Sequence, residues 1–296
     1  MLSTAMIHDQ WQRYLQTRSA GDDGAAMGIA YVPELAAVRF EGSNARSFLQ
    51  GYLTCDTARL EQATLLAAAV CNLKGRVVLN GWCAAENDEN VLLVLHTSLV
   101  DRLAGFLKPY LMFSRNTALV DLRSTVLLLA GLDLPEASGG LAIDARRRLF
   151  PFAALADAQA LWEGHPHLPG GAWLAALSRD GVPLVSATVS ETFLPQMLNL
   201  HTLGAVDFEK GCYLGQEVVA RAQHRGQVKR RLTRLLWHGP AAPEPGAEVT
   251  DAAGKAQGVV LQSAADGADS GVLLAVLRQE APEVLRQGET DLRTMP

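Results

Sequence analysis

The residues from Arg231 to the C-terminus alternate between strand-length apolar runs and turns, and this alternation restricts the fold more than any other feature of the sequence. The runs are RLTRLLW, AEVTD, AQGVVLQ and GVLLAVLR, with a proline-rich joint, GPAAPEPG, at 239–246. Short β-forming runs with turns about every ten residues are typical of small barrels and sandwiches. The sequence therefore predicts a small β-barrel over residues 231–296.

The first part of the chain mixes strands and helices. Apolar runs with strand patterning fall at 26–32, 35–42, 64–73, 76–85 and 91–96. Residues 45–53 and 98–111 have apolar positions at helical spacing, the second helix ending near Pro109. This mixture predicts an α+β core over residues 1–117.

The pattern changes near residue 118. Short strands are expected at 118–122 and 125–131, followed by proline- and glycine-rich connections at 136–140 and 165–171 and a helix at 171–181. We expect residues 118–190 to form an α+β middle domain. Residues 191–230 are expected to pack back on the core, with a helix after Pro195 and another that begins near Gly215.

Composition limits the class of protein. The 296 residues are 49% apolar and 19% charged, so a large core is available. The net charge of −5 argues against a general nucleic-acid binder. No apolar stretch is long enough to cross a bilayer, and the first sixteen residues are amphipathic rather than continuously apolar. These features predict a cytoplasmic protein that does not contact a membrane.

Four cysteines are present: Cys55, Cys71, Cys83 and Cys212. None forms a C-x-x-C pair, and their spacing to the seven histidines matches no zinc site. The sequence therefore predicts neither a disulfide framework nor a metal site built by the protein alone. A single cysteine could still contribute to a shared or transient cluster.

The stretch KGCYLGQE at 210–217 surrounds one cysteine with groups that favour a thiolate. If a helix begins near Gly215, Cys212 lies just before its N-terminus, where unpaired amides carry partial positive charge. Lys210 acts in the same direction if its side chain turns toward the sulfur. The alternative is a small core residue, because lone cysteines often have that role. The residues alone leave both readings open.

The segment KGCYLGQEVVAR, preceded by FLPQMLNLHTLGAVDF, resembles the signature of the YgfZ family, which comprises folate-binding relatives of the glycine-cleavage T-protein, an aminomethyltransferase. The segments SFLQGYLTCD, NLKGRV, KPYLMFSRNTALVDL and WLAALSRDGVPLV are also similar to family members. The resemblance implies a T-protein-like α+β fold in three parts: a discontinuous folate-binding core, a ferredoxin-like α/β part and a C-terminal small β-barrel.

The resemblance also implies a function. Family members support the assembly or repair of iron–sulfur proteins, including iron–sulfur enzymes that modify tRNA. Tetrahydrofolate or a derivative is the implied cofactor, and iron–sulfur client or assembly proteins are the implied partners. The signature cysteine is the family's functional residue, so Cys212 is the implied catalytic thiol. Whether its sulfur contacts a cluster, a persulfide or a folate-borne carbon stays open.

The remaining site residues follow from the same match. The signature positions expected to shape the loop and to present polar groups to the cofactor are Lys210, Tyr213, Gln216, Glu217 and Arg221. Trp173 falls where the family has a tryptophan beside the folate pocket, and its alternative role is plain core packing. Leu35 stands where some relatives have a second tryptophan, which predicts a weaker or rearranged pocket.

The hairpin strand bears on catalysis. As the resemblance implies, the aminomethyltransferases use an aspartate there, whereas this chain has no acidic residue from Cys71 through Ala85. Asn80 cannot act as a base, which argues against classical turnover. A folate-dependent one-carbon transferase and a non-catalytic adaptor for iron–sulfur client proteins stay as alternatives.

A basic run follows the signature, comprising Arg221, Arg225, Lys229, Arg230, Arg231 and Arg234. It has three readings: a solvated joint, a platform for the glutamate tail of folate, and a surface for tRNA or an acidic protein. Missing aromatic residues and the negative net charge argue against direct tRNA binding.

Overall fold

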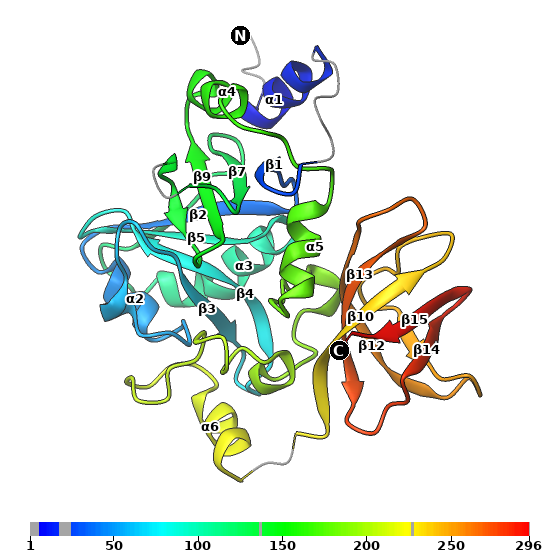
Figure 1. Ribbon diagram of the computed structural model, residues 1–296. Coiled ribbons are helices and arrows are strands. Elements are labelled where there is room, and N and C mark those ends of the chain that lie inside the picture. Colours follow the sequence, from blue (N-terminus) through cyan, green and yellow to red (C-terminus); the bar gives the residue numbers. More distant parts are fainter. Residues whose placement is uncertain (1–5, 18–24, 136–137, 226–227, 296) are drawn as a thin grey trace.

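The computed structural model describes residues 6–17, 25–135, 138–225 and 228–295, with the side chain of Arg225 left out. Two sheets with flanking helices occupy one side of the molecule, and a barrel occupies the other (Figure 1). Helix α6 lies below the five-stranded sheet in this view, and its Val219 joins the buried cluster of that sheet. The predicted loop at 136–140 lies partly outside the described residues.

The five-stranded sheet has the order β3-β4-β5-β2-β6 and is antiparallel throughout. Its strands are β2 (Leu35–Glu41), β3 (Leu66–Cys71), β4 (Val77–Ala85), β5 (Asn90–His96) and β6 (Ala118–Asp121). Helices α2 (Ala45–Gln50) and α3 (Val100–Leu111) contribute Leu49 and Leu103 to the buried cluster on one face. Because every residue of β4 is buried, this strand is central to the core.

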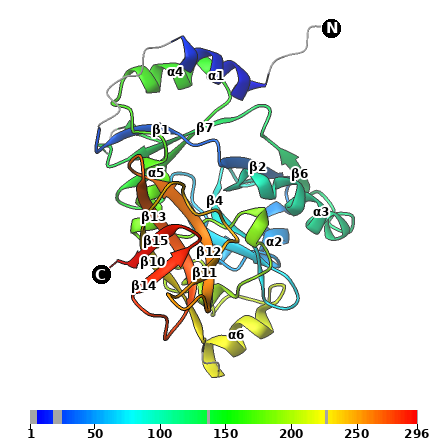
Figure 2. The same cartoon turned by 90° about the vertical axis from the view of Figure 1, so that its right-hand side faces the viewer.

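The four-stranded sheet has the order β1-β7-β9-β8 and packs against the other face. Its strands are β1 (Gly28–Tyr31), β7 (Leu127–Leu132), β8 (Leu141–Ala142) and β9 (Arg147–Phe152). Helices α1 (Ile7–Gln16) and α4 (Leu155–Glu163) lie side by side at one end of the molecule (Figures 1 and 2). Helix α5 (Ala172–Arg179) lies between this sheet and the barrel.

Strand pairing crosses the expected boundary at residue 117. Strand β6 pairs with β2, and β1 pairs with β7, so each sheet takes one strand from the other side of that boundary. The division into parts at 117, 190 and 230 stays a prediction.

The predicted C-terminal β-barrel is confirmed. Six strands close in the order β10-β13-β12-β11-β14-β15. They are β10 (Arg230–His238), β11 (Glu248–Thr250), β12 (Ala256–Ala265), β13 (Ser270–Arg278), β14 (Val284–Gln287) and β15 (Thr290–Thr294). Alternate residues of β10, such as Leu235 and Trp237, enter a buried cluster. The last two strands lie beyond the four runs that the sequence pattern indicated.

The prediction of a long helix after Pro195 is wrong. A 3₁₀ helix covers only Pro195–Leu198, and turns follow it. Asn199 has a left-handed backbone with φ of 55°, which ends the helix. The amide of Leu200 then returns to the carbonyl oxygen of Pro195. The second expected helix is present as α6 (Gln216–Arg225).

Across the described ranges, no helix combines the length and the apolar character that a membrane crossing requires.

Candidate functional site

The signature segment is anchored to the end of α2. The Nζ of Lys210 donates hydrogen bonds to the carbonyl oxygens of Gln50, Leu53 and Cys55 at 2.8, 2.7 and 2.7 Å. The amide of Leu214 donates to the carbonyl oxygen of Gly51 at 2.9 Å. Helix ends leave carbonyl groups without intrahelical partners, and an ammonium group satisfies them well.

This arrangement differs from the orientation considered for Lys210. An ammonium group has three N–H donors, and backbone oxygens accept all three. The side chain therefore does not turn toward Cys212, the orientation in which it would favour a thiolate there. Burial is the main cause that lowers the pKa of Lys210. Lys210 shapes the loop and, in this conformation, has no N–H left for a cofactor.

Cys212 is exposed, whereas the other three cysteines are buried. It lies four residues before the first residue of α6, Gln216. Gly215 brings the loop close against the turn between β3 and β4. Its φ is 82°, and a Cβ there would come within 2.3 Å of the carbonyl oxygen of Asn72. Only glycine accepts this backbone and this contact, so the turn holds the thiol loop in place.

Tyr213 points inward and is buried, whereas its neighbour Cys212 is exposed. It is 6% exposed, and its ring lies 5.3 Å from the Nζ of Lys210, a cation–π contact. Its hydroxyl has no hydrogen-bond partner among the described residues, and burial raises the pKa of Tyr213. The aromatic ring thus belongs to the anchor of the loop.

The three polar signature residues on α6 lie toward solvent. Gln216 is half-buried, and Glu217 and Arg221 are exposed. No ion pair between Glu217 and Arg221 occurs in the described structure, although their spacing suits one. None of these side chains lines the central cavity described next.

A cavity of about 470 Å³ lies between the two sheets and the chain that leads away from α5. Residues from β3 and β4 form one wall, among them Ala68, Asn80 and Trp82, and Arg147 stands at the start of β9. The remaining lining residues fall at 59, 64–67, 81, 143, 144, 180, 182, 183, 200 and 203–205. None of the site residues expected from the sequence is among them.

Asn80 occupies the strand position where the sequence lacks an acid. Its Nδ2 donates to the carbonyl oxygen of Pro183 at 2.7 Å, and its Oδ1 accepts the amide of Val185 at 2.8 Å. The residue is 4% exposed. Asn80 therefore ties β4 to the chain after α5, and its amide is engaged in structure.

Arg147 is the buried charge of the cavity wall. Its Nε donates to Asp144 at 2.8 Å, and its Nη2 pairs with Asp144 and Asp180 at 2.7 and 3.2 Å. Its Nη1 is buried without any hydrogen-bond partner among the described residues. Because a buried charged donor without a partner is costly, this atom is the clearest sign of a missing acceptor.

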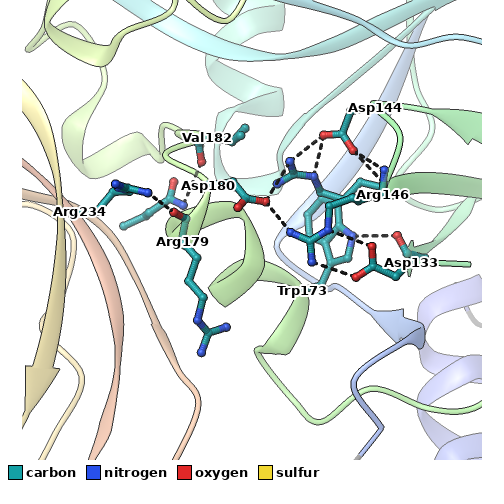
Figure 3. A network of polar contacts seen from close by, with 11 residues as sticks. Asp133, Asp144, Arg146, Trp173, Arg179, Asp180, Val182 and Arg234 are labelled. Carbon is teal, nitrogen blue, oxygen red and sulfur yellow. Dashed lines mark hydrogen bonds and ion pairs between the residues drawn. The ribbon is translucent and has the colours of Figure 1, made fainter. Parts of the chain in front are cut away.

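Figure 3 shows the wider network of polar contacts to which Asp144 and Asp180 belong. Arg146 pairs with Asp133 at 2.9 Å and with Asp180 at 3.0 Å. The hydrogen bond from Arg146 is the main cause that lowers the pKa of Asp133. Asp180 is thus shared by two arginines, which fixes the chain after α5 against the start of β9.

Trp173 lies behind the cavity wall. It is 1% exposed, and its Nε1 donates to the carbonyl oxygen of Gly131 at 3.3 Å. Its ring meets Trp82 edge-on, with centroids 6.2 Å apart. Leu35, also 1% exposed, fills the same cluster. Trp82 is the aromatic residue among those that line the cavity. Its position two residues after Asn80 on the same strand indicates in the sequence that both side chains lie on one face of the sheet.

The basic run stands apart from this cavity. Lys229, Arg230 and Arg231 are exposed where α6 leads into β10 (Figure 1). Arg234 donates to the carbonyl oxygen of Arg179 at 3.0 Å and helps join the barrel to α5. The side chain of Arg225 lies outside the described part of the chain. Within the described ranges, no group of three His, Cys, Asp or Glu side chains could hold a metal ion.

The fold matches a known structure. The crystal structure of the glycine cleavage system aminomethyltransferase T from Bartonella henselae aligns with a TM-score of 0.68. The alignment covers 96% of this chain and 87% of the other at 16% sequence identity. The predicted T-protein-like fold is thereby confirmed.

Curated relatives identify the family. The tRNA-modifying protein YgfZ of Sodalis glossinidius is 32% identical over 70% of this chain and 71% of the relative. The protein of the same name from Cronobacter sakazakii is 31% identical over 81% of this chain and 80% of the relative. No model of a protein family matches the sequence. On the strength of these relatives, and with the fold and signature segment described above, the chain belongs to the YgfZ family.

Proposed function

We propose that the protein binds a tetrahydrofolate in the central cavity and supports the iron–sulfur enzymes that modify tRNA, with Cys212 as its reactive thiol. The observation that carries the proposal is the cavity of about 470 Å³ with Trp82 in its wall and the unpaired Nη1 of Arg147 beside it. The relatives named as tRNA-modifying proteins support the link to tRNA modification.

The cavity suits a folate by size and by chemistry. Small-molecule sites commonly measure about 300–1,000 Å³ and combine apolar walls with a few polar groups. Trp82 offers an aromatic surface to a pterin, and Arg147 offers a donor to a carbonyl or carboxylate oxygen. When bound, tetrahydrofolate would supply ring nitrogens that carry a one-carbon unit. The residues of this chain would bind the ring, orient it and exclude water.

The position of Cys212 favours a reaction of its thiol with a group carried by a partner protein. The thiol is exposed on a loop that is fixed from below by Lys210 and Gly215, and it is not among the residues that line the cavity. A thiol in this place suits a cluster or persulfide carried by another protein better than a carbon atom on a folate inside the cavity. No classical turnover by this chain is part of the proposal.

Calorimetric titration with tetrahydrofolate tests the cavity. We expect saturable binding by the wild type and at least a tenfold weaker affinity for Arg147→Met. Arg148→Met is the matched control, because the neighbouring side chain is not among the residues that line the cavity and donates to the carbonyl oxygen of Gly139. No saturable binding at millimolar tetrahydrofolate, or equal affinities for both variants, would contradict the assignment.

Complementation in cells tests the thiol. A strain that lacks its own family member should recover tRNA modification by iron–sulfur enzymes with the wild type and not with Cys212→Ser. Modified nucleosides are quantified by mass spectrometry of digested tRNA. Glu209→Gln, an exposed change in the same loop, is the control. Full activity of Cys212→Ser would remove the thiol from the proposal.

An adaptor without its own chemistry is the second candidate, and exposed apolar residues favour it. Leu73, Met112 and Phe113 are 73%, 76% and 87% exposed. A neighbouring groove of about 510 Å³ is lined by Leu73, Tyr110 and the signature residue Leu214, among others. If this candidate is correct, Leu73→Glu abolishes co-purification with a client enzyme, whereas Arg147→Met leaves it intact.

A further inference from the structure

Two buried cysteines face each other away from the signature thiol. The Sγ atoms of Cys55 and Cys83 are 3.8 Å apart. Cys55 is 1% exposed and lies in the turn after α2, and Cys83 is 0% exposed and lies on β4. The pair is separated by 28 residues in sequence and brought together only by the fold.

The surroundings make the two thiols unequal. Cys83 also lies 3.5 Å from the carbonyl oxygen of Leu66, a second acceptor for its proton. The hydrogen bond from Cys83 lowers the pKa of Cys55 against the effect of burial, and the nearby Lys210 ammonium acts in the same direction. That hydrogen bond, together with burial, raises the pKa of Cys83. Cys55 is therefore the thiol that ionises first and attacks.

We propose that Cys55 and Cys83 are an oxidation site that closes to an intramolecular disulfide with hydrogen peroxide as the oxidant. The Cys55 thiolate attacks one peroxide oxygen, so an S–O bond forms and the O–O bond breaks, releasing hydroxide. Cys83 loses its proton and attacks the resulting sulfenic sulfur, which forms the S–S bond and releases the second oxygen as water. Two thiols and one peroxide give one disulfide and two waters.

Leu66 lines the central cavity and is the register partner of Cys83. Cys55 and Cys83 themselves belong to the buried cluster on the face of β4 opposite to Trp82, so a small oxidant reaches them only through an opening of that cluster. To form the bond, the sulfur atoms must approach from 3.8 Å to about 2.05 Å. The cross-link joins the turn held by Lys210 to the strand that carries Asn80 and Trp82.

Neither a folate nor Cys212 takes part in this oxidation. The test uses the full-length Cys212→Ser protein, reduced and then treated with hydrogen peroxide in native buffer. After quenching, the protein is denatured and alkylated with N-ethylmaleimide, and its intact mass is measured. Before peroxide we expect three adducts, and afterwards one, at Cys71. Peptide mapping should place the link between Cys55 and Cys83, and dithiothreitol should restore all three adducts.

A further cysteine substitution provides the control. Adding Cys83→Ala should leave Cys55 without a partner, so peroxide should no longer remove two adducts through a disulfide that dithiothreitol can reduce. If this variant fails to fold, Cys55→Ala provides the same control by removing the other thiol. The proposal is overturned if both thiols stay alkylatable in Cys212→Ser at peroxide levels that oxidise Cys212 in the wild type. A disulfide that includes Cys71 would also overturn it.

Discussion

Lys210, which anchors the signature loop, and Arg147, in the cavity wall, are both buried charges, but they differ in how fully their hydrogen-bond donors are satisfied. At the anchor, one ammonium group, Lys210, meets three backbone carbonyl oxygens and has no donor left. At the wall, Arg147 is held by two aspartates yet keeps a buried Nη1 without a partner in the described structure. All donors of the first group are satisfied by the fold, whereas the second keeps one N–H donor that a ligand acceptor could satisfy.

The difference distinguishes a structural role for Lys210 from a ligand-binding role for Arg147, although both are buried basic residues. A fully satisfied buried charge is expected to stabilise the native loop and to ignore ligands. A partly satisfied charge is expected to gain from a ligand that supplies the missing acceptor.

Removal of the anchor should have the largest effect on stability. Lys210→Met leaves three carbonyl groups without their charged donor, and we expect a loss of about 3 kcal/mol in the free energy of unfolding, since hydrogen bonds to charged groups contribute about 1.5–3 kcal/mol each and water recovers part of this. Denaturant unfolding measures it. Lys74→Met, on the exposed turn nearby, is the control. A loss below about 1 kcal/mol would show that the anchor is not structural.

Ligand linkage should distinguish the two charges. At a hundredfold excess over its dissociation constant, tetrahydrofolate should raise the unfolding free energy of the wild type by about 2.7 kcal/mol. We expect Lys210→Met to keep this increment, because the anchor is outside the cavity. Arg147→Met should keep about half of it or less at the same ligand concentration, because an affinity weaker by tenfold or more removes about 1.4 kcal/mol or more. Equal increments in both variants would erase the distinction.

The buried thiol of Cys71, beneath the signature loop, should lower the free energy of unfolding at alkaline pH. A Cβ on Gly215 would lie 3.3 Å from the Cβ of Cys71, and burial raises the pKa of Cys71 from 9.0 to about 12. The unfolded chain therefore loses this proton first, so the stabilisation is complete below pH 9 and is lost as pH rises toward 12. By pH 10.5 the loss is about 2 kcal/mol.

Unfolding by denaturant at pH 8 and pH 10.5 measures that loss. Cys71→Ala should be less sensitive to this pH change than the wild type by about that amount, whereas Cys212→Ser should match the wild type. If Cys71→Ala and the wild type lose equal stability between the two pH values, the alkaline sensitivity comes from other groups.

The exposed thiol should have the smallest effect on folding. Cys212 is exposed and lies in a loop held by its neighbours, so Cys212→Ser should change the unfolding free energy by less than about 0.5 kcal/mol. The same variant is expected to abolish function in cells. A large loss of stability would mean that the complementation result reflects folding rather than chemistry.

Local patterns determined much of the fold. The alternation after Arg231 was sufficient to predict the barrel, because a strand that buries one face must alternate apolar and polar residues. The helix near Gly215 followed from local composition in the same way. The segment after Pro195 was predicted incorrectly as a helix, since a left-handed Asn199 and packing in turns overrode its apolar spacing.

The site depended on contacts that no local pattern carries. The sequence identified Cys212 and its loop, but the Lys210 ammonium binds a carbonyl oxygen 157 residues away. Trp82 rather than Trp173 reaches the cavity because the packing of α5 turns one ring behind the other. Arg147 and the pair of Cys55 and Cys83 had no signal at all. Residue type and spacing fix what a segment can bury, whereas the partner of each buried polar group is decided only when distant segments meet.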